Sequence, residues 1–264
     1  MQWWLAYLAI GALAGFIAGL LGIGGGAVIV PLLVFAFTSQ GVPETHLLHL
    51  ALATTMATIA FTSVSSARAH HSHGSVDWSM ARIMLPGMLT GAFIAALIAG
   101  MVPTRPLAIV FTALIFVAAT QVILDLRPKS TRSILGPAGV FAAASFIGAV
   151  SSVLAVGGAF LTIPFLAWCN VPLRRAIGTA AANGFPIAVA GTAAYVFQGW
   201  SVPGRPAGTL GYVYLPALAL IAVSSIFTAP AGARLAQRLP VKRLRIVLAL
   251  ILYALAIRLL IRLW

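Results

Sequence analysis

Two glycine-rich stretches hold the residues of this chain that are best suited to bind a charged solute. The first covers residues 22–26 and is followed by Pro31, and the second covers residues 157–159 and is followed by Pro164. Glycine costs about 1 kcal/mol relative to alanine inside a helix, so each stretch predicts a helix break. A helix that restarts after such a break presents unpaired N–H groups and a partial positive charge at its N-terminus. This is the chemistry of an anion site that needs no charged side chain.

Both stretches lie in long apolar runs, 3–37 and 133–168, that contain no acidic or basic residue. In lipid, a loosened backbone cannot bond to bulk water, so it must be covered by protein or line a wet cavity. The alternative is that the glycines only allow helices to pack closely. Paired breaks, each followed by a proline five or six residues later, favour a transport site. We expect Pro31, Pro164 and Pro186 to kink their helices and to take part in gating.

The apolar segment after each break carries polar side chains that could bind the oxygens of an anion. Thr54 and Thr58 share one helical face, with Thr55 beside them, and Thr179 and Asn183 occupy the equivalent positions in the second half. A buried amide needs partners or a ligand. The alternative use of these groups is bonding between helices, which is worth about 0.6 kcal/mol per bond in membranes. The predicted substrate-binding set is Gly24, Gly25, Gly26, Thr54, Thr55, Thr58, Gly157, Gly158, Ala159, Thr179 and Asn183.

The composition excludes a soluble globular protein. Hydrophobic residues make up 61% of the 264 residues and charged residues only 7%. Apolar runs of the length needed to cross a bilayer, about 20 residues, recur along the whole chain. The sequence therefore predicts an all-α polytopic membrane protein. The predicted segments are 3–37, 47–67, 79–101, 106–125, 133–168, 173–198, 209–233 and 243–263.

The two halves of the chain repeat each other in sequence order. Gly15, Gly25 and Pro31 match Gly148, Gly158 and Pro164; further along, Thr54 matches Thr179 and Leu85-Pro86 matches Leu215-Pro216. Several matches in the same order are not expected by chance. We therefore predict two transmembrane repeats of four segments each, 1–132 and 133–264, within one integral membrane domain.

The net charge of +13 is explained by membrane topology rather than by a nucleic-acid partner. If all eight segments cross the membrane, Lys and Arg divide eight against eight between the two sides. If each broken segment enters and leaves on the same side, they divide twelve against four, as the positive-inside rule requires. This second arrangement predicts inverted repeats and places both termini outside the cytoplasm. As a helix, residues 27–37 would span only about 16 Å, so we expect a return limb that is partly extended.

The G-x-G-G-G stretch with its following proline, its echo in the second half and the threonine-bearing segment after each break resemble the TauE/SafE sulfite exporter family, also called the toluene-sulfonate uptake permeases. The resemblance covers essentially the whole chain. It implies transport of small sulfur-containing anions, such as sulfite, sulfonates or sulfoacetate, across a bacterial inner membrane. The chain departs from the family at Ala155 and Ala159, which weaken the second glycine cluster, and at Ala180, where the family often has a hydroxyl residue.

These features predict a secondary anion transporter that alternates access around a site between the two breaks. A passive anion channel is the alternative, because the same helix ends could line a continuous pore. An intramembrane serine hydrolase is disfavoured because it needs a serine with a base in reach, whereas the histidines lie at segment boundaries and the region of Ser151 has no internal partner. No cofactor, metal site or nucleic-acid partner is expected beside the lipid bilayer and a small anion, and the oligomeric state stays open.

The titratable residues are expected to lie outside the site. The three acids, Glu44, Asp77 and Asp125, fall in loops or at segment ends, so any proton coupling would require a histidine or the substrate itself. We expect all five histidines to be interfacial or solvated, and a metal site in the 70–73 loop is only weakly indicated. Arg68 and Arg82 are interpreted as topology determinants rather than as residues that attract anions.

Overall fold

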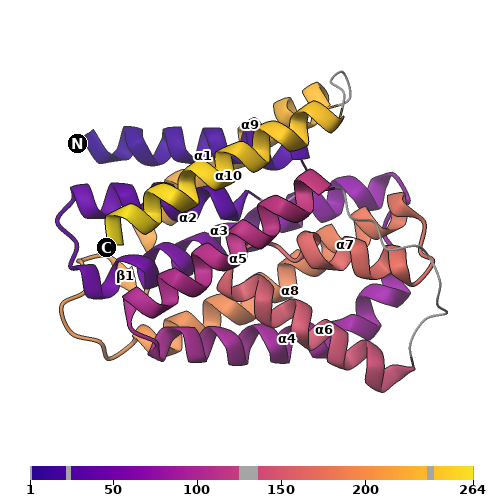
Figure 1. The fold of residues 1–264 in the computed structure, drawn as a ribbon, viewed down its shortest axis with the longest axis horizontal. Helices are drawn as coiled ribbons and strands as arrows, with labels where there is room; N and C mark the ends of the chain where they lie inside the picture. The colour runs from indigo at the N-terminus through magenta and orange to yellow at the C-terminus, as the bar shows by residue number, and fades with distance from the viewer. Residues whose placement is uncertain (1, 22–24, 125–135, 237–240, 264) are drawn as a thin grey trace.

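The computed structural model describes residues 2–21, 25–124, 136–236 and 241–263. These residues form ten α-helices and one antiparallel pair of short strands (Figure 1). Five helices, α3, α4, α5, α8 and α9, are long and apolar enough to cross a membrane, which confirms the all-α polytopic class. The elements are α1 (Gln2–Leu21), α2 (Gly26–Ser39), α3 (Glu44–Ser72), α4 (Trp78–Met101), α5 (Thr104–Leu124), α6 (Pro137–Val153), α7 (Ala159–Trp168), α8 (Leu173–Gly199), β1 (Thr209–Leu210), β2 (Val213–Tyr214), α9 (Leu215–Ala236) and α10 (Val241–Leu263).

Both glycine stretches interrupt a helix, as the sequence predicts. The first lies between α1 and α2 and the second between α6 and α7. Gly25 and Gly158 precede α2 and α7 with φ values of 66° and 78°, a left-handed conformation that glycine adopts without strain. Gly24 lies outside the described residues. Each break therefore starts a new helix from a glycine of the same backbone geometry.

Two expectations about local structure are wrong. Residues 27–37 are helical rather than partly extended, because α2 does not span the molecule and is buried along most of its length. The start of the segment expected at 209–233 is a hairpin, because Gly208 and Gly211 adopt positive φ and turn the chain before α9. Both corrections follow from features that a hydropathy pattern does not encode, namely the packing of other helices around α2 and the glycine turns before α9.

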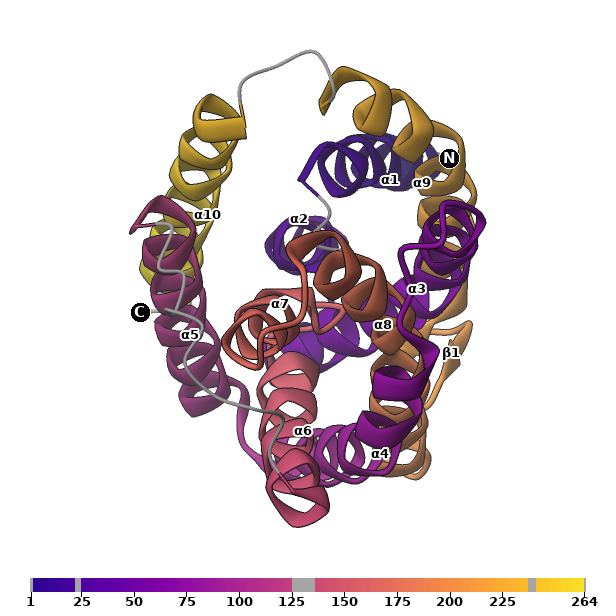
Figure 2. The ribbon, with the colours of Figure 1, turned by 90° about the vertical axis from the view of Figure 1, so that its right-hand side faces the viewer.

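The two short helices lie inside the bundle. Viewed along the long axis, α2 and α7 lie near the middle of the bundle with α8 beside α7, and α1, α4, α5, α6, α9 and α10 lie around them (Figure 2). α2 and α7 extend from the centre toward opposite ends of the molecule (Figure 1). Both termini, the α2–α3 connection and the hairpin lie at one end, whereas the α3–α4 loop lies at the other (Figure 1). The breaks therefore lie deep in the fold.

The most extensive helix contacts join a helix of one half of the chain to a helix of the other half. α1 packs along α9 and α6 packs along α4, while α3 and α8 pack against each other. Gly15 approaches the backbone of Ser225 on α9, and Gly148 approaches that of Met88 on α4. Pro86 lies in the third turn of α4 and Pro216 is the second residue of α9, so the sequence match between Leu85-Pro86 and Leu215-Pro216 stays a prediction.

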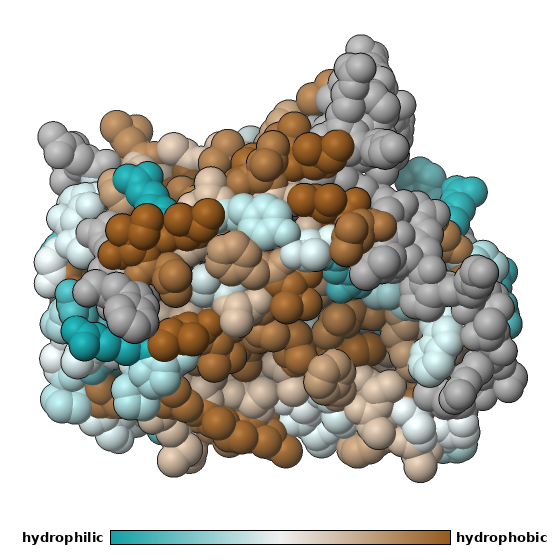
Figure 3. Space-filling model, in the orientation of Figure 1, coloured by the Kyte–Doolittle hydropathy of each residue, from teal (hydrophilic) through white to brown (hydrophobic). Residues whose placement is uncertain are grey.

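The outer surface has the pattern of a protein in a bilayer. On the face shown in Figure 3, apolar side chains cover the middle and hydrophilic ones gather toward the two ends. Large apolar side chains are exposed on several outer helices, for example Ile98, Val117 and Phe227. In water such a surface would aggregate, whereas in lipid it is solvated.

Candidate functional site

The two helix breaks meet in the core. A Cβ added to Gly26 would lie 1.7 Å from the carbonyl oxygen of Ala155, so the start of α2 touches the second break directly. Ile59 of α3 contacts both breaks, since its side chain lies near the Cβ positions of Gly26 and Gly157. Only a glycine allows the backbone approach at residue 26. The N-terminal end of α2 therefore packs against the linker that precedes α7.

The start of α7 presents backbone donors that the helix itself does not use. Gly158 accepts hydrogen bonds from the N–H groups of Leu161 and Thr162. The N–H groups of Ala159 and Phe160 have no acceptor within the described residues. These orphan donors and the positive end of the helix dipole are what an anion would bind.

Two buried threonine hydroxyls near the breaks have no partner. Thr55 and Thr162 are fully buried, and neither Oγ1 has a hydrogen-bond partner in the described part of the chain. Thr55 lies one helical turn before Ile59, on the face that meets the breaks. The Oγ1 of Thr162 is 3.6 Å from the Cβ position of Gly158. Thr162 was not among the predicted site residues, although it lies in the duplicated stretch four residues after a break glycine.

The other predicted threonines already make hydrogen bonds. The Oγ1 of Thr54 accepts from the N–H of Tyr214 at 3.0 Å, and that of Thr179 accepts from the N–H of Asp77 at 3.0 Å. These two equivalent residues each hold the residue that precedes α9 or α4. Thr58 donates to the carbonyl of Thr54 within its own helix. Binding of a substrate by these three residues stays a prediction, and their present contacts fix the backbone.

Asn183 lies beside the second break with its amide almost unpartnered. It is 2% exposed, and its only hydrogen-bond partner in the described residues is the Sδ of Met84, 3.7 Å from Nδ2. The next residue, Gly184, packs so closely that an added Cβ would lie 2.8 Å from the carbonyl oxygen of Gly157. A thioether is a weak acceptor, so this buried amide retains most of its capacity for a ligand.

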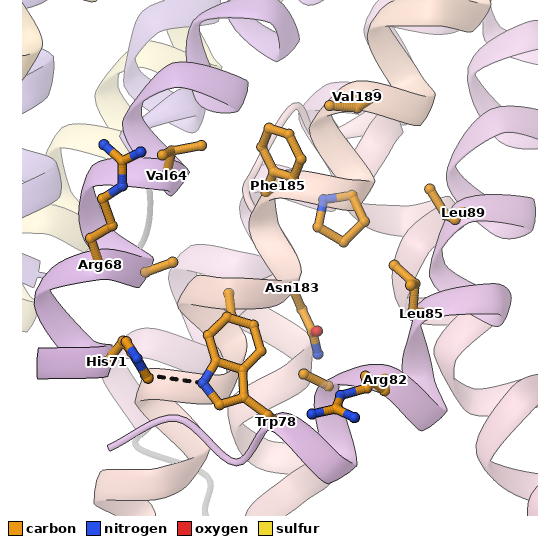
Figure 4. A pocket seen from close by; sticks show the side chains of 14 residues that line it. Val64, Arg68, His71, Trp78, Arg82, Leu85, Leu89, Asn183, Phe185 and Val189 are labelled. Carbon is orange, nitrogen blue, oxygen red and sulfur yellow. Dashed lines mark hydrogen bonds between the residues drawn. The ribbon is translucent and has the colours of Figure 1, made fainter. Parts of the chain in front are cut away.

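A pocket of about 560 Å³ leads from Asn183 toward the α3–α4 loop (Figure 4). It lies between the end of α3, the first half of α4 and the middle of α8. Its lining includes Arg68 and Arg82, for which the sequence favours a role as topology determinants over attraction of anions to the cytoplasmic mouth. The fold thus places two guanidinium groups at the same cavity as the predicted amide. Sequence spacing alone could not show that the two helix ends face α8.

One histidine is not solvated, contrary to expectation. His49 is 3% exposed, and its Nε2 lies 3.0 Å from the carbonyl oxygen of Val102. Its ring stacks on Tyr212 with a centroid distance of 5.1 Å, and its buried Nδ1 has no partner in the described residues. The loop histidines differ: His71 is exposed and accepts a hydrogen bond from Trp78. No group of three potential metal ligands occurs among the described residues.

The prolines predicted to act in gating lie inside helices. Pro31, Pro164 and Pro186 are internal to α2, α7 and α8. Each lacks an N–H and so removes one backbone hydrogen bond from its helix. Their role in gating stays a prediction.

Comparison with known proteins matches these features to a family. The model of the family described as "Sulfite exporter TauE/SafE" matches residues 7–259, nearly the whole chain and both breaks. The chain belongs to this family. The match extends across both halves, so it includes Asn183 and the arginine-lined pocket as well as the glycine stretches.

Curated relatives of this TauE/SafE family member carry one kind of name. A probable membrane transporter protein of Haemophilus influenzae is 38% identical over 254 residues, covering 96% of each chain. A protein of the same description in Bacillus subtilis, YdhB, is 27% identical over 71% of this chain and 77% of its own length. One in Methanocaldococcus jannaschii is 24% identical, covering 93% and 91%. No solved structure matches the chain. Family, relatives and fold together indicate a multi-pass membrane transporter.

Proposed function

We propose that this protein is a secondary transporter of small sulfur-containing anions, of the sulfite, sulfonate or sulfoacetate type, in a bacterial inner membrane. The anion binds where the two helix breaks meet. The repeats 1–132 and 133–264 have inverted topology, and their relative rocking exposes the site to one side and then to the other. Both termini lie outside the cytoplasm.

The contact between Gly26 and Ala155 is the observation that carries the proposal. It places the start of α2 against the break that precedes α7, and the N–H groups of Ala159 and Phe160 at the start of α7, which have no acceptor in the part of the chain that the structure describes, are free for an anion. The buried hydroxyls of Thr55 and Thr162 add donors with no protein partner in the described residues. An unpaired buried polar atom costs about 1–3 kcal/mol, so a ligand that satisfies it gains that energy.

The site lacks groups that would repel an anion or relay protons. Among the described residues the acids are Glu44 and Asp77, at the start of α3 and at the N-cap of α4. Asp77 accepts a hydrogen bond from the N–H of Met80 and so is already committed to its helix. With no acid at the breaks, the partial charges of the helix ends act unopposed.

Removal of the two orphan hydroxyls tests the proposal. Thr55→Val and Thr162→Val keep side-chain shape, so the ligand-free double variant should be as stable as the native protein or more stable. Binding of sulfite and methanesulfonate, measured by thermal stabilisation of purified protein, should weaken about 10- to 100-fold per hydroxyl, because each bond to an anion is worth about 1.5–3 kcal/mol.

Thr112→Val is the matched control, since Thr112 of α5 has the same kind of buried, unpartnered hydroxyl. It should leave anion binding unchanged. Equal binding by the native protein and the double variant would overturn the site. Counterflow of labelled sulfite in proteoliposomes distinguishes a transporter from a channel, because only a site that alternates exchanges solute against an opposing gradient.

A further inference from the structure

The pocket between α3, α4 and α8 is open to the side of the bundle. Three of the apolar residues that line it are also exposed on the outer surface: Leu85 is 37% exposed, Phe185 43% and Val189 42%. Since α4 and α8 are long and apolar enough to cross a membrane, these exposed residues face lipid. The pocket is therefore a lateral groove that membrane lipid can enter.

The lateral groove extends over the thickness of one leaflet. On α4 its lining starts at Trp78, the first residue of the helix, and reaches Leu89, the twelfth of 24. A rise of 1.5 Å per residue over this stretch gives about 16 Å, which is half of a hydrocarbon core of about 30 Å. On α8 the exposed lining residues Phe185 and Val189 lie near the middle of the helix. The groove thus runs from a membrane interface to the midplane, as an acyl chain does.

The wall that α4 contributes to the groove begins with a positive charge. Arg82, Leu85 and Leu89 are spaced by three and four residues and so follow one face of the helix. In Figure 4 Arg82 lies between Trp78 and Leu85, whereas Arg68 lies on the other side of the cavity. Arg82 is exposed and forms no hydrogen bond or ion pair with any described residue. No acid is among the described residues that line the pocket, so this charge has no counter-charge in the groove.

Two neighbours of Arg82 mark the level of the lipid headgroups. Trp78 is exposed, and tryptophan is enriched where a bilayer meets water. Its indole N–H can only donate, so the Nδ1 of His71, 3.1 Å away, is the acceptor. A neutral His71 then carries its proton on Nε2, which is left to donate to another group. This end of the groove therefore combines a guanidinium group with further N–H donors, which are the groups that bind a phosphate.

We propose that the lateral groove binds one anionic phospholipid of the leaflet next to the α3–α4 loop. The lipid phosphate binds Arg82, and an acyl chain packs along Leu85, Leu89 and Val189 toward the midplane. Arginine is charged at every physiological pH and binds phosphate oxygens through several N–H groups at once. The apolar wall adds nothing to the binding of a free phosphate ion, whereas it contacts an acyl chain along the whole groove. The inference goes beyond the transport function and uses neither helix break.

Native mass spectrometry of the full-length protein tests the inference. The protein in neutral detergent is incubated with equal amounts of phosphatidylglycerol and phosphatidylcholine that carry the same acyl chains. One phosphatidylglycerol per chain should be retained in preference to phosphatidylcholine. Arg82→Gln should reduce this preference about tenfold or more, because a bond to a charged group is lost. Arg105→Gln, which changes an exposed arginine at the start of α5, is the matched control and should keep the preference.

Changing the apolar wall gives the complementary result. Leu85→Asn and Val189→Asn replace exposed residues of the wall, so they should weaken retention of both lipids and keep the preference for phosphatidylglycerol. Equal retention of the two lipids by the native protein, or an equal preference in Arg82→Gln and Arg105→Gln, would overturn the inference. Displacement of phosphatidylglycerol by inorganic phosphate would overturn it by showing a site for the free ion. A dimer without bound lipid would do the same, because a second copy of the chain would then cover the groove.

Discussion

Single glycines decide whether the two breaks can meet. At Gly26 an added Cβ would collide with the backbone oxygen of Ala155, whereas at Gly157 the nearest atom is Cγ2 of Ile59, 3.3 Å away. We expect Gly26→Ala to destabilise the protein by about 3 kcal/mol or more, since backbone must move, and Gly157→Ala to cost about 1 kcal/mol or less. Thermal unfolding in detergent measures both. Equal stability of the two variants would show that α2 and the second break do not touch.

Candidate residues of types that are rare in apolar helices could be predicted from the sequence. Residues whose role depends on contacts with segments distant in sequence could not. The glycines and Asn183 stand out because each is costly in an apolar helix. His49 did not stand out, because its burial is created by the hairpin residue Tyr212, far away in sequence. Arg68 and Arg82 were assigned to topology because an arginine at a helix end carries no sign of which helix faces it.

At the scale of elements, one threonine in each half of the chain accepts a hydrogen bond from the residue that precedes a helix of the other half. Thr54 of α3 holds Tyr214 before α9, and Thr179 of α8 holds Asp77 before α4. Since α9 packs on α1 and α4 packs on α6, each bond joins a core helix to an outer pair. These two bonds are placed to set the position of the outer pairs relative to the core.

Valine at either position should loosen this connection. Thr54→Val and Thr179→Val each leave a partly buried N–H without an acceptor, which costs about 1–3 kcal/mol. Thr54→Ser and Thr179→Ser retain the oxygen and should cost less. Amide hydrogen exchange should speed up at Tyr214 in the first variant and at Asp77 in the second. Unchanged exchange at both amides would contradict the role given to these bonds.

Hydropathy predicted where most helices lie, but it did not predict where each helix begins or which helices pack around it. The apolar runs gave most long helices to within a few residues, because spanning length is set by the bilayer. It could not show that α2 stays helical, since that depends on α1, α3 and α10 packing around it. It also could not separate the hairpin from α9, because the turn is formed by glycine conformations rather than by polarity.

At the scale of the whole molecule, the arginines nearest the pocket gather at one end. Arg68 and Arg82 flank the α3–α4 loop, and the Nε of Arg174 donates to Ser75 of that loop at 3.2 Å. The positive-inside rule predicts that this end faces the cytoplasm. The pocket would then open to the cytoplasm, and the hairpin and both termini would face outward (Figure 1).

Cysteine labelling measures this orientation in cells. The variants are made on a Cys169→Ala background, which removes the buried native thiol. Ser72→Cys and Ala138→Cys should react only with reagents that enter the cytoplasm, whereas Ser39→Cys and Ser201→Cys should react with reagents added outside. All four replaced residues are exposed. The reason is geometric. The 29 residues of α3 span about 43 Å, which is more than the apolar core of a bilayer. Ser39 precedes the start of α3 and Ser72 is its last residue, so the two serines lie on opposite sides of the membrane. Because α6 starts at the end of the molecule where α3 finishes (Figure 1), inverted repeats predict that the cysteine at position 138 is labelled from the same side as the cysteine at position 72. Labelling of Ala138→Cys from outside would exclude inversion, and labelling of Ser72→Cys from outside would reverse the direction in which the pocket faces.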